Sequence, residues 1–438
     1  SFEAVRVERE IAGRTLTLET SRMAKQADGA VVATYGETVV LSTAQSSKGR
    51  DDIDWFPLTV DYRERPAAAG KIPGGFFKRE ARPTAKEILG CRIIDRAIRP
   101  LFPDGYKNEV QVLSLVLASD LEQESEIIGA IACFAALAIS SIPHEKILGA
   151  CRVGLINEEL CVNPTWTQLQ SEENNLNLTV VAHDSAVVMV EAGAKEVSEE
   201  TLLEALELAH EVCRDVAELI GDLVDVAGKE KQEFHPPERD TRLDSRIEKD
   251  FGDMLKAAPS TGATKKDRGE SKSAAKAEVL EAFALSDKAS ADEVRAHNKY
   301  VGMVCGELMD LGEREAILDG RRTDGRDSTT IRAITPEVAV LPRVHGSSLF
   351  TRGETQALVT ATLGTPEDRQ MIDGIYPEPD KRFLLHYNFP PFSVGEVKRF
   401  GFVGRREIGH GALAERSLDP ILPAHEDFPY TIRLTSEI

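Results

Sequence analysis

The strongest chemical signal in the sequence is a short basic segment, residues 404–411. Arg405 and Arg406 stand at the start of a predicted helix, and His410 follows Arg406 by four residues on the same helical face. The start of a helix attracts anions through its backbone N–H groups, and the glycines of this segment let a ligand approach the backbone. The pattern indicates a site for inorganic phosphate or a phosphodiester, with Arg405, Arg406 and His410 as catalytic candidates. A single histidine is more often structural, but the paired arginines and the glycines favour function.

A second segment, residues 74–83, combines two adjacent glycines with two aromatic and several basic side chains. Phe76 and Phe77 come directly before Lys78 and Arg79, and Arg82 follows. Proteins hold single-stranded nucleic acid with such a set, because rings stack on bases while cations meet phosphates. An equally good interpretation is that the two phenylalanines fill the core beneath their own loop.

The helix predicted after this segment carries Arg92, Arg96 and Arg99 on one face. Like charges on one face repel one another unless acids or an anion lie against them. Asp95 is the acid nearest in sequence, so an anionic partner such as RNA is one hypothesis. Ion pairing with acids elsewhere in this acidic chain is the other.

An internal repeat indicates which elements must position these residues. Residues 28–38 match residues 345–355 at an offset of 317, and each predicts two strands joined by a turn that contains glycine. In a second match, at an offset of 320, a helix ends at a proline in both copies. The residues that match are Glu87, Ile88, Arg96, Pro100 and Pro103 with Glu407, Ile408, Arg416, Pro420 and Pro423. The chain therefore holds two copies of one α/β unit.

The two copies differ at the residues that could do chemistry. The positions of Arg405, Arg406 and His410 in the second copy are held by Ala85, Lys86 and Gly90 in the first. The scaffold is kept while the anion-binding set is lost. We therefore predict that the second copy is the chemical half and that the first copy guides RNA.

The first copy continues well beyond its first helix. Strands are predicted near residues 110–117, 150–155, 176–182 and 186–191, and helices near 127–142 and 199–226. The second copy reaches only a strand at 430–438, so we expect the chain to stop about halfway through it, and Ser1 suggests a trimmed start. Residues 229–310, between the copies, are charged, rich in alanine and predicted to be helical, with a mobile loop at 257–273.

The composition is that of an ordinary soluble globular protein of two or three domains, with 438 residues, 42% hydrophobic and 29% charged residues. The net charge of −20 means that a polyanionic partner would need a local basic patch, such as residues 78–99. The longest apolar stretch, 127–142, is interrupted by serines and indicates a buried helix, so no membrane partner is expected. The start lacks a signal-peptide pattern, and the six scattered cysteines predict neither zinc sites nor disulfides. The cytoplasm is the expected location.

Several specific segments resemble the polynucleotide phosphorylase (polyribonucleotide nucleotidyltransferase) family. They are residues 56–62, 76–83, 94–103, 350–357, 386–391 and 405–416. The resemblance covers nearly the whole chain and is weakest over 229–310. It implies an α/β (α+β) fold of two RNase PH-like units, of the ribosomal protein S5 domain 2-like type, joined by a small all-α domain. The implied ranges are 1–228 for the first unit, 229–312 for the helical domain and 313–438 for half of the second unit.

The activity implied by this resemblance is 3′-to-5′ phosphorolysis of single-stranded RNA, which serves mRNA degradation. Inorganic phosphate, the co-substrate, attacks the terminal phosphodiester and releases nucleoside 5′-diphosphates, and the reaction is reversible. Three chains form a ring, a homotrimer, and components of the RNA degradosome are further partners in the bacterial cytoplasm. Mg²⁺ is the implied cofactor. Its acidic ligands are expected beyond Ile438, so no metal ligand is assigned in this chain, which is predicted to be inactive alone.

The family's functional residues carry over at matching positions. Phe77, Lys78, Arg79 and Arg82 resemble the pore constriction that holds RNA, although arginine is commoner where Lys78 stands. The predicted RNA-binding set is completed by Arg92, Arg96, Arg99 and Arg352. The segment that starts at Arg405 resembles the site for phosphate and the scissile group.

Three other functions were compatible with parts of this pattern. A hydrolytic nuclease would release monophosphates without added phosphate. A non-catalytic RNA-binding ring subunit of an exosome-like assembly would keep the scaffold alone, and the intact Arg405, Arg406 and His410 weigh against it. An unrelated acidic metabolic enzyme would not bind RNA at any salt concentration.

Overall fold

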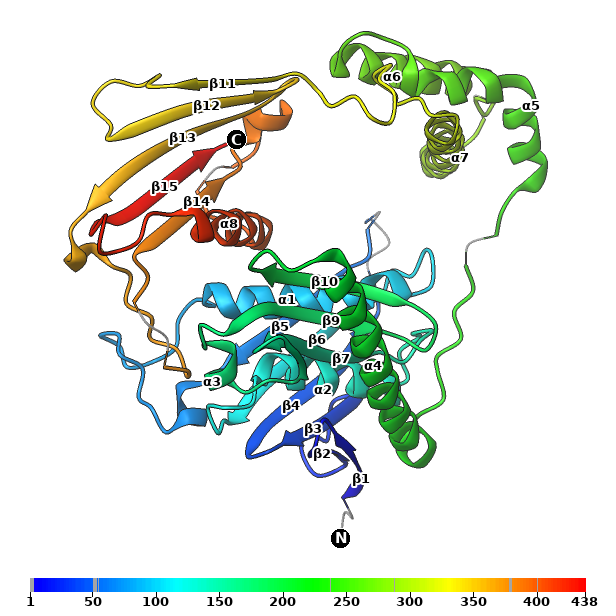
Figure 1. Ribbon diagram of the computed structural model, residues 1–438. Coiled ribbons are helices and arrows are strands. Elements are labelled where there is room, and N and C mark those ends of the chain that lie inside the picture. Colours follow the sequence, from blue (N-terminus) through cyan, green and yellow to red (C-terminus); the bar gives the residue numbers. More distant parts are fainter. Residues whose placement is uncertain are drawn as a thin grey trace. The chain divides into compact units, whose positions relative to one another are not determined.

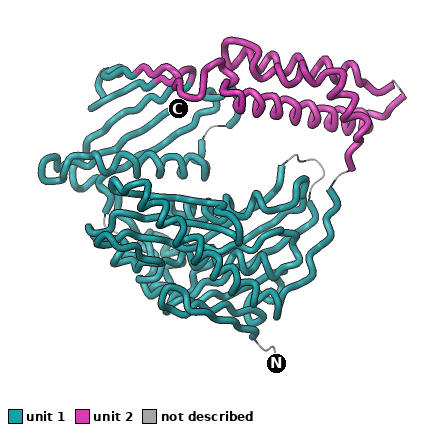
Figure 2. The backbone as a smooth tube through the Cα atoms, turned by 45° about the vertical axis from the view of Figure 1, so that its right-hand side comes forward, with its two compact units in different colours: residues 1–236, 336–350, 355–438 teal, residues 237–335, 351–354 magenta. Residues whose placement is uncertain are grey.

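A computed structural model describes residues 4–49, 53, 55–236, 238–286, 288–377, 380–399 and 401–438. The chain divides into two compact units (Figure 2). The first contains residues 1–236, 336–350 and 355–438, and the second contains residues 237–335 and 351–354. None of the helices in the described ranges is long and apolar enough to cross a membrane.

The first copy is built on a six-stranded sheet in the order β1-β2-β3-β4-β6-β5 (Figure 1). The strands are β1 (Val5–Ile11), β2 (Arg14–Thr20), β3 (Gly29–Tyr35), β4 (Thr38–Ser47), β5 (Leu58–Glu64) and β6 (Glu109–Ala118). β3 and β4 are antiparallel around Gly36, whose φ of 62° is one that glycine adopts without strain. β6 is antiparallel to β4 and parallel to β5, so the chain crosses over between β5 and β6 through α1 (Ala85–Ile98).

Two helices bury the core of this copy. Every residue of α2 (Ser125–Ile139) is buried, and the helix packs on β3 and β4. α4 (Glu199–Ala227) packs on α2 and on a second sheet of order β10-β9-β7-β8. That sheet consists of β7 (Gly149–Ile156), β8 (Glu159–Val162), β9 (Asn174–Ala182) and β10 (Val187–Ala194), with the short α3 (Trp166–Leu169) between β8 and β9 in the chain.

The second copy repeats this strand order in a five-stranded sheet, β11-β12-β13-β15-β14. The strands are β11 (Ile334–Val338), β12 (Gly346–Arg352), β13 (Thr355–Gly364), β14 (Phe383–Asn388) and β15 (Thr431–Glu437). β15 is antiparallel to β13 and parallel to β14, and α8 (Arg405–Leu418) crosses between β14 and β15. The order β12-β13-β15-β14 matches β3-β4-β6-β5, which confirms the predicted repeat of one α/β unit.

The second unit is helical. It contains α5 (Thr241–Ala257), α6 (Lys265–Ala282) and α7 (Ala291–Leu318). Their buried faces form a small apolar core that includes Ile247, Leu255, Val279, Val301 and Cys305. The predicted mobile loop at 257–273 is wrong, because α6 already begins at Lys265. Thr264 and Asp267 form a capping box there, which satisfies backbone N–H groups at the start of the helix.

Smaller differences from the predicted elements have local causes. The helix expected at 127–142 ends at Ile139, because Ser140 is extended and its hydroxyl donates to the carbonyl of Leu137 at 2.7 Å. β8 has four residues, too few for a visible alternation of apolar and polar side chains. α1 and α8 are each followed by a 3₁₀ turn that contains the predicted proline, Pro100 or Pro420.

Candidate functional site

The start of α8 is fastened to the end of β14 by one acidic residue. Glu407 accepts a hydrogen bond from the N–H of Gly404 at 2.6 Å and another from the N–H of Phe389 at 3.0 Å. Glu87 does the same in the first copy, where it accepts from the N–H groups of Thr84 at 2.7 Å and Glu64 at 2.9 Å. Backbone N–H groups thus engage both carboxylate oxygens of Glu407, one from the start of α8 and one from the end of β14.

A cleft of about 480 Å³ opens beside the start of α8. Arg406 and His410 line it together with aromatic side chains, Tyr387, Phe389 and Phe402, and two further cations, Lys398 and Arg399. The Arg406 guanidinium lies 5.7 Å from the centre of the Phe389 ring, and the His410 ring lies edge-on to Tyr387 at 5.3 Å. Among the described residues, no acid forms an ion pair with Arg406 or Arg399. Two acids, Glu396 and Glu407, also line the cleft, and Glu396 pairs with Lys398 at 3.4 Å. Arg406 and Arg399, beside the aromatic rings, are suited to a phosphorylated, base-containing ligand.

The environment of His410 favours the neutral imidazole. Burial lowers the pKa of His410 below its ordinary value, and the nearby charges of Arg406 and Arg92 lower it further. Arg92 belongs to α1, and it reaches α8 at Gly409, where an added Cβ would lie 2.3 Å from the Arg92 Nε. Because Gly409 has no side chain, Arg92 of the first copy can approach His410 of the second copy.

Arg405 does not line this cleft. Its guanidinium donates to the backbone carbonyl of Val60 and to the carboxylate of Asp61, both on β5. Consecutive residues on a helix point about 100° apart, which separates Arg405 from Arg406. These contacts favour a structural role for Arg405 in joining α8 to the first copy.

The aromatic loop (residues 71–83) presents its rings to solvent. Phe76 is 92% exposed and Phe77 is 86% exposed, and the two rings meet edge to face at 5.4 Å. The alternative that these phenylalanines fill their own core is therefore wrong. Arg82 lies over the ring of Phe402 at 5.2 Å, so this loop contacts the rim of the α8 cleft.

The remaining predicted RNA-binding arginines fall into different environments. Arg99 pairs with Asp95 at 2.6 Å and donates to the carbonyls of Phe56 and Leu58, which favours the ion-pairing alternative for this residue. Arg92 and Arg96 form no ion pair within the described part of the chain. Arg352 is exposed at the end of β12 and belongs to the second unit.

Lys398 and Arg399 are cleft residues that the prediction missed. The repeat contained the signal that could have found them, since Lys78 and Arg79 match Lys398 and Arg399 at the same offset of 320. Tyr387 and Phe389 lie within residues 386–391, a segment whose sequence alone predicts no role for them. Their position follows from the pairing of β14 with β15, which a linear motif does not reveal.

The corresponding place in the first copy has a different charge environment. Lys86, the counterpart of Arg406, lies 3.4 Å from the carboxylate of Glu64 and 3.8 Å from the centre of the Tyr376 ring. Gly90 replaces His410, and an added Cβ there would lie 2.9 Å from the Tyr62 ring. Lys86 therefore has an acid beside it, whereas Arg406 has no ion pair among the described residues.

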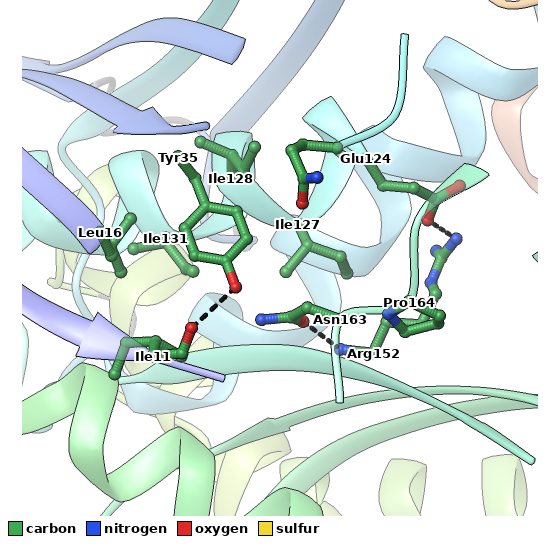
Figure 3. A pocket seen from close by; sticks show the side chains of 11 residues that line it. Ile11, Leu16, Tyr35, Glu124, Ile127, Ile128, Ile131, Arg152, Asn163 and Pro164 are labelled. Carbon is green, nitrogen blue, oxygen red and sulfur yellow. Dashed lines mark hydrogen bonds and ion pairs between the residues drawn. The ribbon is translucent and has the colours of Figure 1, made fainter. Parts of the chain in front are cut away.

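Other hollows and clusters are weaker candidates. A small apolar cavity in the first copy, about 20 Å³, has room for about one water molecule (Figure 3). Its two charged lining residues, Glu124 and Arg152, are paired with each other, and the Tyr35 hydroxyl donates to the carbonyl of Ile11. The described residues contain no group of three or more His, Cys, Asp or Glu side chains that could hold a metal ion.

Comparisons with known proteins agree on one family. The model of the 3′ exoribonuclease family, domain 1, matches residues 12–143 and 330–438, and the domain 2 model matches residues 146–212. Polyribonucleotide nucleotidyltransferases of Chloroflexus aggregans and of Caulobacter sp. are 49% and 50% identical over 99% and 100% of this chain. The chain spans only 57% and 60% of the length of these two relatives.

Solved structures give a more distant match. An archaeal exosome core chain is 16% identical, with a TM-score of 0.36, over 50% of this chain and 87% of that one. Rice (Oryza sativa) Rrp46 is 14% identical, with a TM-score of 0.39, over 49% of this chain and 96% of that one.

Proposed function

Because the chain belongs to the 3′ exoribonuclease family, we propose that it is part of a polyribonucleotide nucleotidyltransferase, which shortens single-stranded RNA from the 3′ end with inorganic phosphate. One observation carries the proposal. The cleft beside α8 combines Arg406 and Arg399, neither paired with a described acid, with His410 and three aromatic rings. That combination suits an RNA end, whose phosphates need cations and whose bases need surfaces on which to stack.

The proposed reaction exchanges one bond for another. An oxygen of inorganic phosphate attacks the phosphorus of the 3′-terminal nucleotide, and the bond from that phosphorus to the 3′ oxygen of the preceding nucleotide breaks. The leaving oxygen takes up a proton, so the products are a nucleoside 5′-diphosphate and an RNA one nucleotide shorter. Arg406 would hold phosphate oxygens, and His410 would form a hydrogen bond to the same groups.

Further parts of the proposal come from the family. We propose a division into a first RNase PH-like unit at 1–228, a helical domain at 229–312 and part of a second unit at 313–438. Mg²⁺ would supply stabilisation of charge on the attacking and leaving oxygens, with ligands outside the described residues. A homotrimeric ring, an association with the RNA degradosome and a bacterial cytoplasmic location complete the proposal.

The binding site is tested by replacing its free cation. Arg406→Met should weaken binding of a fluorescent oligoadenylate about tenfold, because one charge-assisted contact contributes about 1.5 kcal/mol or more. Arg214→Met, an exposed arginine on α4, is the matched control and should bind as the unaltered chain does. Equal affinity in both variants would contradict the proposed site.

The reaction type is tested by its products. We expect the natural protein that contains this chain to release ADP from oligoadenylate only when phosphate is present. The variants His410→Asn and Arg406→Met should lose this activity. AMP release without phosphate would indicate hydrolysis instead. RNA binding without any product would favour the non-catalytic ring subunit.

A further inference from the structure

The aromatic loop has almost no apolar packing of its own. Its two phenylalanines are exposed, and Ile72 is 76% exposed as well. Without other contacts, the side chains of such a loop would have no fixed positions. Ordering them on binding would cost conformational entropy and weaken the binding of a ligand. Something outside the loop must therefore position it.

Three hydrogen bonds join this loop to the segment between β13 and β14. The Gly74 N–H donates to the carboxylate of Asp373 at 2.7 Å. The Lys71 ammonium donates to the carbonyls of Gly374 at 3.1 Å and Ile375 at 2.8 Å. The loop and this segment, residues 370–376, also line one large cleft of about 1290 Å³. The second copy therefore contacts the loop of the first at its base.

The segment at 370–376 is anchored at its C-terminal end, although Met371 and Asp373 are exposed. Ile375 is 1% exposed and Tyr376 is 2% exposed, both within the core of the first copy. The Tyr376 hydroxyl donates to the carbonyl of Gln123 at 2.8 Å and accepts from the N–H of Ser125 at 2.9 Å, at the start of α2. Its ring lies 4.7 Å from that of Trp166. The segment can thus act as a rigid support for a loop that lacks one.

Gly74 fits this contact closely. An added Cβ at Gly74 would lie 2.6 Å from the Asp373 carboxylate, whereas an added Cβ at Gly75 would meet nothing within 4 Å. A methyl group at Gly74 would therefore displace the Asp373 carboxylate, whereas one at Gly75 would not touch it. Beyond the contact, the Lys78 N–H donates to the Gly75 carbonyl at 3.0 Å, which continues the ordered backbone toward the phenylalanines and Arg79.

We propose that Asp373 and Lys71 are positioning residues, through which the segment at 370–376 of the second copy holds the aromatic loop of the first copy in place to grip RNA. The inference rests on the proposed function, which it deepens. The same segment leads into β14, whose Tyr387 lines the α8 cleft, so one stretch of chain orders both the loop and a wall of the site.

The test compares variants that break the contact with variants that keep it. Asp373→Ala and Gly74→Ala break it, while Asp373→Asn keeps an acceptor oxygen and Gly75→Ala leaves the contact alone. We expect the first pair to weaken binding of a 20-nucleotide oligoadenylate about five- to tenfold and to leave binding of ADP, which reaches only the α8 cleft, unchanged. The second pair should bind both ligands normally.

A second readout follows the loop without RNA. Trypsin cleavage after Lys78 and Arg79 should be several-fold faster in Asp373→Ala and Gly74→Ala, with an unchanged melting temperature, because only the loop is released. Wild-type affinity for the 20-nucleotide RNA together with wild-type cleavage in these variants would overturn the inference. The double variant Phe77→Ala/Arg79→Ala separates the two proposals. If it binds RNA normally, the gripping role of the loop is wrong, while trypsin still measures whether Asp373 positions the loop.

Discussion

Single residues in this protein take their roles from what surrounds them. Glu87 and Glu407 occupy matching places and make the same two kinds of backbone hydrogen bond. Both glutamates join a helix to the neighbouring strand, α1 to β5 and α8 to the end of β14, so their role is structural. Arg406 and Lys86 also match, yet Arg406 faces an open cleft and Lys86 lies beside Glu64.

The charge of Arg92 should be measurable at His410. Arg92→Met removes a positive neighbour that disfavours the imidazolium ion, so the pKa of His410 should rise toward its ordinary value while burial keeps it below. NMR titration of the histidine ring protons gives this pKa directly. Arg96→Met, one helical turn further along α1, is the control and should leave it unchanged. A titration of His410 unaffected by Arg92→Met would contradict the described approach of the two helices.

His144 should make the first unit less stable in mild acid. Burial lowers the pKa of His144 from 6.5 to about 4, and the charge of Lys231 adds to the effect. Below pH 6.5 His144 is protonated in the unfolded chain but stays neutral in the folded chain. The free energy of unfolding therefore falls as the pH falls toward 4. The loss between pH 7 and pH 5 is about 2 kcal/mol. Urea unfolding of His144→Asn at both values should show a smaller loss, and equal losses in the two proteins would refute the assignment.

At the scale of elements, close packing decides which glycines are needed. β7 approaches α4 so closely that a Cβ on Gly149 would lie 1.9 Å from the backbone oxygen of Cys213, whereas Gly221, within α4, has open space around it. Gly149→Ala should destabilise the unit by on the order of 3 kcal/mol, because backbone cannot move aside as a flexible side chain can. Gly221→Ala should stabilise it by about 0.5–1 kcal/mol, through the better helix propensity of alanine. Thermal melts of both variants check the pair, and similar shifts would contradict the described contact between β7 and α4.

At the scale of the whole molecule, a net charge of −20 coexists with a basic cleft and loop. RNA should therefore bind only where cations gather, and each phosphate contacted should release counterions. For three or four contacts on single-stranded RNA, the logarithm of the binding constant should fall with the logarithm of salt concentration at a slope of about −2 to −3. Fluorescence anisotropy over a range of KCl concentrations measures the slope. Binding that is insensitive to salt would mean that these cations do not meet the phosphates.

Much of the architecture, and the segment that carries the chemistry, could be predicted from the residues alone. The repeat predicted two copies of one α/β unit, because each copy must bury the same alternating apolar face. Arg406 and His410, one turn apart on α8, line one cleft as their spacing predicts. The exposure of Phe76 and Phe77 was left open, since a loop has no periodicity from which burial can be inferred.

Which of these side chains contact one another depends on long-range packing. Arg405 and Arg406 are neighbours in sequence, but packing of α8 against β5 turns one toward Asp61 and leaves the other in the cleft. Lys398, Arg399 and Phe389 join that cleft, and Asp373 reaches Gly74, through contacts between residues far apart in the chain. The periodicity of the sequence determines on which face of a helix or strand a side chain lies. Contacts between residues far apart in the chain determine what packs against that face, and sequence periodicity carries no information about them.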